Sequence, residues 1–83
     1  MSPRELSKEI QRSAKLVLDL ETEVAAAESA LKGLEHALAA PPEGTDLHKL
    51  TREFEQAQGK VSRAFEAWEK ESHRLEELKA MQG

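Results

Sequence analysis

Apolar residues recur at the first and fourth positions, a and d, of a seven-residue repeat in two long segments of the chain. In the first segment, the a positions are Ile10, Val17, Val24, Leu31 and Leu38, and the d positions are Leu6, Ser13, Leu20, Ala27 and Leu34. In the second segment, the a positions are Leu47, Phe54, Val61, Trp68 and Leu75, and the d positions are Leu50, Ala57, Ala64, Glu71 and Leu78. A strict repeat of this kind gives a helix one apolar face and is typical of a coiled coil. The pattern therefore predicts an all-α fold of two long helices that meet along an apolar seam.

The break between the segments contains Pro41, Pro42 and Gly44. Adjacent prolines cannot continue a helix, because each lacks an N–H group and clashes with the preceding turn. The sequence therefore predicts a single domain, residues 1–83. We expect a helix over about 3–39, a loop over about 40–45 and a helix over about 46–81. A loop this short makes the helices antiparallel, so the fold is a coiled-coil hairpin, a rod roughly 50 Å long at 1.5 Å per residue.

Capping residues support these helix ends. Ser2, Pro3 and Glu5 have the pattern of a capping box, with proline at the first helical position. Thr45 or Asp46 can cap the second helix.

Charges beside the seam indicate how the helices align. In an antiparallel pair, Glu9 lies opposite Arg74, Leu16 opposite Ala67 and Glu23 opposite Lys60, and each pairing is complementary.

Side-chain volumes suggest a closely related register with Ser13 beneath Trp68 and Ala27 beneath Phe54, and a shift by one heptad also keeps the seam apolar. Glu71 is the one acidic residue on the seam. We expect it to turn to solvent or to pair with Lys15 or Lys70.

Composition narrows the functional classes. The chain has 83 residues, no cysteine, 12 Lys and Arg and 16 Asp and Glu, for a net charge of −4. The absence of cysteine argues against a disulfide-stapled secreted fold. No long apolar run and no signal-peptide pattern occur, so we expect a cytoplasmic protein that does not enter the membrane. A two-helix seam is only marginally stable alone, so we expect the hairpin to dimerise, to dock on a partner or to be one part of a longer protein.

Catalytic chemistry has no candidate residues here. There is no glycine-rich phosphate loop, no nucleophile motif and no cysteine. His36, His48 and His73 fall at outer heptad positions, scattered along the rod, so no metal site is expected. We therefore expect no enzyme activity, no cofactor and no small-molecule substrate.

Basic residues gather toward the end of the hairpin where the chain begins and ends, whereas residues 21–46 carry six acidic residues and one lysine. The candidate nucleic-acid contacts are Arg4, Lys8, Arg12, Lys15, Lys70 and Arg74. Such a strip could follow a phosphate backbone without reading bases. It could equally be a solvated coiled-coil face, because acidic residues are interleaved with it.

Among the apolar residues outside the a and d positions are Leu16, Leu18 and Phe65. Phe65 and Leu16 could simply widen the seam, with Leu18 an isolated exposed residue. Alternatively, the three could form the interface with a partner or with a second hairpin in a homodimer.

Parts of the second segment resemble a known family. These parts are Leu47-His48-Lys49-Leu50-Thr51-Arg52-Glu53-Phe54, Ala64-Phe65-Glu66-Ala67-Trp68-Glu69 and Leu75-Glu76-Glu77-Leu78. Together with Glu5-Leu6-Ser7-Lys8-Glu9, they are similar to the C-terminal coiled-coil domain of ABC-F ATPases of the Uup kind. The resemblance implies an accessory domain that binds DNA, or structured or ribosomal RNA, next to ATP-binding cassettes that these residues do not include. The alternative is a protein-interaction or oligomerisation module with no nucleic-acid role.

Overall fold

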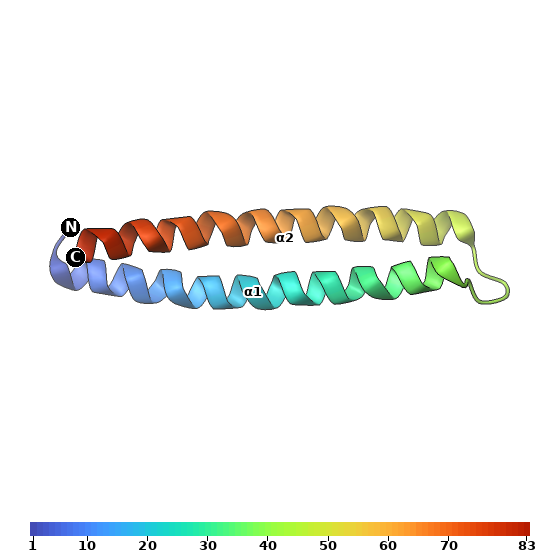
Figure 1. Cartoon of the computed structure of the whole chain (residues 1–83), viewed down its shortest axis with the longest axis horizontal. Coiled ribbons are helices and arrows are strands. Elements are labelled where there is room, and N and C mark those ends of the chain that lie inside the picture. Colours follow the sequence, from blue (N-terminus) through green and yellow to red (C-terminus); the bar gives the residue numbers. More distant parts are fainter.

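The computed structural model describes residues 1–83 as two long α-helices joined by a short loop. Helix α1 spans Pro3–Ala39 and helix α2 spans Leu47–Gln82. The helices lie side by side and run in opposite directions, so that both termini lie at one end and the loop at the other (Figure 1). The molecule measures 61 × 14 × 14 Å. The all-α helical hairpin predicted from the seven-residue repeat is confirmed.

The start of α1 is fixed by the side chain of Ser2. Its hydroxyl accepts a hydrogen bond from the Glu5 backbone N–H at 3.2 Å and donates one to the Glu5 carboxylate at 3.0 Å. Pro3 occupies the first helical position, where its missing N–H would have had no intrahelical partner. These contacts place the first turn of α1 where the capping pattern predicts it.

The loop reverses the chain through a tight turn that glycine permits. The Thr45 N–H donates to the Pro42 carbonyl at 3.1 Å, and Gly44 has a φ angle of 81°. A positive φ at the third residue of a β-turn is characteristic of type II turns, where glycine is preferred. Asp46 then caps α2 by accepting from the Lys49 N–H at 3.1 Å, so α2 begins at Leu47, one residue later than the sequence indicated.

The seam between the helices is thin and only partly shielded from water. The buried residues are Leu6, Ser13, Ala27, Leu75 and Leu78, and every one of them is a predicted a or d position. The remaining a and d residues are half-buried, with the exception of Leu47. No side chain is completely enclosed. Each apolar residue therefore contributes less than the roughly 1.5–3 kcal/mol expected for full burial.

Leu47 was expected on the seam, and that expectation is wrong: 55% of its surface is exposed. Leu47 is the first residue of α2, and α1 ends at Ala39 before the loop. The last turn of α1 therefore leaves this side chain largely uncovered.

Candidate functional site

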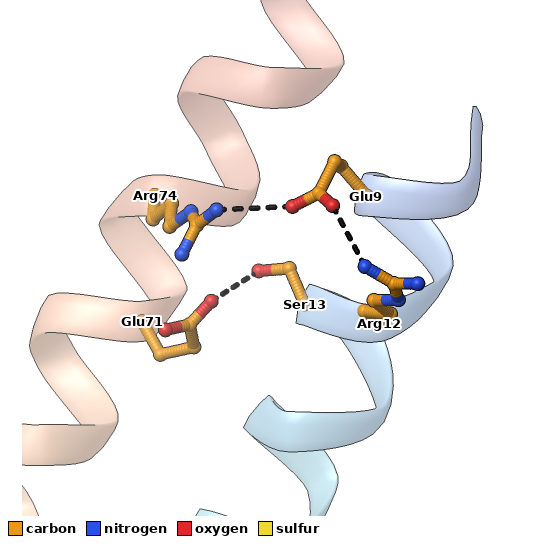
Figure 2. Close-up of polar contacts among 5 residues, drawn as sticks. All are labelled: Glu9, Arg12, Ser13, Glu71 and Arg74. Carbon is orange, nitrogen blue, oxygen red and sulfur yellow. Dashed lines mark hydrogen bonds and ion pairs between the residues drawn. The ribbon is translucent and has the colours of Figure 1, made fainter. Parts of the chain in front are cut away.

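A polar cluster joins the two helices near their free ends (Figure 2). Arg74 of α2 donates to the Glu9 carboxylate of α1 at 3.1 Å, as the complementary flanking charges predict. The other Glu9 oxygen accepts from Arg12, also at 3.1 Å. A single carboxylate thus holds two guanidinium groups, one from its own helix and one from the opposite helix.

The two polar residues of the seam bind each other. The Ser13 hydroxyl donates to the Glu71 carboxylate at 2.6 Å, and Ser13 is only 4% exposed (Figure 2). The expectation that Glu71 pairs with Lys15 or Lys70, or turns to solvent, is therefore wrong. A buried hydroxyl and a half-buried carboxylate are each stabilised by the hydrogen bond, which replaces contacts with water.

Side-chain volumes suggested that Trp68 lies over Ser13, and that expectation is wrong. Its indole N–H donates to the Glu21 carboxylate at 3.3 Å, about two helical turns farther along α1. Its ring also packs against Phe65, with centroids 5.5 Å apart and planes tilted by 41°. The Ser13–Glu71 and Glu9–Arg74 contacts fix a register in which the indole is displaced toward the middle of the rod.

The predicted basic residues fall into two groups. Arg12 and Arg74 are engaged by Glu9, whereas Arg4, Lys8, Lys15 and Lys70 are exposed and form no ion pair. On α1, the basic residues Arg4, Lys8, Arg12 and Lys15 follow one another at spacings of four, four and three residues. Such spacings place consecutive residues beside each other on a helix surface. We call this set the basic row.

The three predicted interface residues are not brought together. Leu16 lines a small pocket of about 130 Å³ beside the polar cluster, with Glu9 and Arg74. Phe65 lines a different groove with Trp68, on the opposite flank of the seam. Leu18 is 63% exposed and lines neither pocket. One partner helix lying along the rod could not cover both Leu16 and Phe65.

Sequence reasoning missed the groove beside Phe65 and the Ser13–Glu71 bond. The groove has a volume of about 300 Å³ and is lined by Glu21, Val24, Ala25, Glu28, Phe65 and Trp68. The signal for the bond was present, because the alignment of Glu9 with Arg74 also places Ser13 opposite Glu71. The groove depends on how the side chains of Phe65 and Trp68 pack together, which the repeat does not specify.

Comparison of the chain with protein-family models, with curated proteins and with solved structures yields no match.

The side chains of His, Asp and Glu form no group of three or more that could hold a metal ion. His73 is exposed and contacts only Glu77, one turn away, at 2.8 Å. Neither helix has an apolar stretch of the length that crossing a membrane requires.

Proposed function

We propose that the hairpin is a non-enzymatic module that contacts the phosphate backbone of duplex DNA, or of structured RNA, through its basic row. Lys70 and Arg74 of α2 extend this surface at the same end of the rod. The contacts are electrostatic and independent of base sequence. The resemblance to the C-terminal domains of ABC-F ATPases supports the same function, in the cytoplasm and beside cassettes that these residues do not contain.

The observation that carries the proposal is the arrangement of like charges on α1. Arg4 and Lys8, Lys8 and Arg12, and Arg12 and Lys15 are neighbours on the helix surface. Like-charged pairs at these spacings destabilise a helix by about 0.2–0.5 kcal/mol each. The row also starts in the first turn of α1, where the helix dipole disfavours positive charge. A bound polyanion would remove both penalties.

Glu9 relieves only part of this repulsion, because it contacts Arg12 and leaves Arg4, Lys8 and Lys15 without a carboxylate partner. From Arg4 to Lys15 the row extends roughly 16 Å along the helix, about the length of five base pairs of B-DNA. With Lys70, four cations are available without breaking an internal ion pair. We therefore expect a log–log dependence of affinity on salt with a slope of about −3 to −4 for DNA.

The experiment is a titration of labelled duplex DNA, and of a hairpin RNA, at low and moderate salt. The test variant is Lys8→Gln/Lys15→Gln, which should reduce the slope on DNA by about two. The matched control is Lys32→Gln/Lys49→Gln, which removes the same charge from the other half of the rod and should leave the slope unchanged. Absence of binding at tens of micromolar protein in low salt would refute the proposal. Equal losses in the two variants would mean that only net charge matters.

Self-association is the alternative that the sequence offers, through Leu16, Leu18 and Phe65. Light scattering tests it directly: a dimer that dissociates on Phe65→Ser or Leu16→Ser substitution, with no change in nucleic-acid affinity, would favour this alternative. The opposite pattern is expected if the basic row is the functional surface.

A further inference from the structure

The groove beside Phe65 combines apolar walls, an exposed Phe65 packed against a half-buried Trp68, and two carboxylates that form no ion pair. Phe65 and Trp68 of α2 form one wall, and Val24 and Ala25 of α1 form the other. Phe65 remains 45% exposed although it packs against Trp68. The groove therefore lies open beside the seam, and the ring of Phe65 at its edge packs against the neighbouring indole.

Two carboxylates border this groove, and neither has a cationic partner. Glu21 accepts the indole N–H of Trp68 at 3.3 Å, which holds its side chain at the edge of the aromatic pair. Glu28 lies one heptad farther, about 10 Å along α1. Neither residue forms an ion pair, although Lys32 lies one turn beyond Glu28. On α2, Glu66 follows Phe65 and Glu69 follows Trp68, and neither forms an ion pair.

We infer that this groove is the docking site for a cationic amphipathic helix of another protein. An apolar side chain of that helix would fill the space between Val24 and Phe65. An arginine or lysine one or two turns away would meet Glu21 or Glu28. A guanidinium group could in addition lie over the exposed aromatic ring, since cations are attracted to aromatic faces. This surface is separate from the basic row, so the inference does not depend on nucleic-acid binding.

The charges decide against a second copy of this chain as the occupant. Most small assemblies close with two-fold symmetry, which brings the same surface of each copy together. Such a dimer at the groove would bring the Glu21 and Glu28 carboxylates of one copy close to those of the other. Like charges brought together at an interface are strongly unfavourable, whereas a basic helix would neutralise both carboxylates.

The test uses a synthetic helical peptide of about 20 residues, with leucine at helical spacing and arginine on both sides of the leucine stripe. A second peptide carries glutamine in place of each arginine. Anisotropy of a labelled peptide gives the dissociation constant. Emission from Trp68, the only tryptophan in the chain, reports whether the groove is the site. The protein variants are Glu21→Gln/Glu28→Gln and, as a control of equal charge away from the groove, Glu53→Gln/Glu55→Gln.

We expect the arginine peptide to bind and to change the Trp68 emission, with the glutamine peptide much weaker. The Glu21→Gln/Glu28→Gln variant should lose about tenfold in affinity, the combined contribution of two partly exposed ion pairs. The control variant should bind like the parent protein. Equal binding of the two peptides, equal losses in the two variants, or no binding at sub-millimolar peptide would overturn the inference. A dimer that dissociates on Phe65→Ser substitution would also overturn it, because the groove would then hold a second copy.

Discussion

The hydrogen bond between Ser13 and Glu71 predicts a strong departure from additivity when the two residues are replaced. Ser13→Ala removes a 2.6 Å bond to a charged group, a type that contributes about 1.5–3 kcal/mol. Because Glu71 is only half-buried, water compensates part of this loss, and we expect a decrease of about 1 kcal/mol in the free energy of unfolding. Glu71→Leu adds about 1 kcal/mol through partial burial of leucine, but leaves the buried Ser13 hydroxyl without a partner at a similar cost. This single variant should be nearly neutral.

In the double variant Ser13→Ala/Glu71→Leu, the new leucine is still partly buried and no polar group is left without a hydrogen-bond partner. It should be about 1 kcal/mol more stable than the parent protein, so that the two substitutions are coupled by about 2 kcal/mol. Urea denaturation followed by far-ultraviolet circular dichroism measures all four proteins. As a control, Thr22→Ala combined with Glu71→Leu should be additive, because Thr22 bonds only to the Leu18 carbonyl of its own helix. The reasoning is refuted if the Ser13 and Glu71 substitutions add within about 0.3 kcal/mol.

Three further predictions concern stability. Leu75→Ala should reduce the free energy of unfolding by about 1–2 kcal/mol, and Leu47→Ala by less than about 0.5 kcal/mol, because 9% of Leu75 is exposed against 55% of Leu47. Similar losses in urea denaturation would contradict the described seam. Gly33→Ala should stabilise the hairpin by about 0.5–1 kcal/mol, because the added Cβ meets no atom within 4 Å. Gly44→Ala should destabilise it, because Gly44 has a φ of 81° that alanine rarely adopts. Thermal denaturation would show the two melting temperatures shifted in opposite directions. Glu9→Gln should lower stability by less than about 1 kcal/mol at low salt and by still less at high salt; a loss independent of salt would argue against the two ion pairs.

The repeat determined the fold because each helix has only one apolar face, and a short loop leaves only one way to pair two such faces. The caps at Ser2 and Asp46 could also be predicted, because each cap depends only on residues within one helical turn. The Glu9–Arg74 pair followed from the alignment of flanking charges.

Details that depend on side-chain conformation did not follow from the repeat. The indole of Trp68 donates to Glu21 and packs against Phe65, and both aromatic residues line the groove. Volume matching placed Trp68 over Ser13 because it ignored the preference of Ser13 and Glu71, both polar, for each other. The basic row could be recognised from the spacing of its residues in the sequence. Which basic residues form an ion pair with Glu9, and which form none, depends on where the Glu9 carboxylate lies in the structure.

The two ends of the rod are held together by different means. At one end the loop tethers the helices covalently, so their apolar residues meet at a high effective concentration and can tolerate looser packing. At the other end no loop joins the two helices, and there Leu6, Leu75 and Leu78 are buried and Arg74 bridges to Glu9. These contacts therefore oppose fraying of the helix ends at the end of the rod that the loop does not hold. As a consequence, the backbone amides of the basic row should be protected from hydrogen exchange, although they lie close to a helix end.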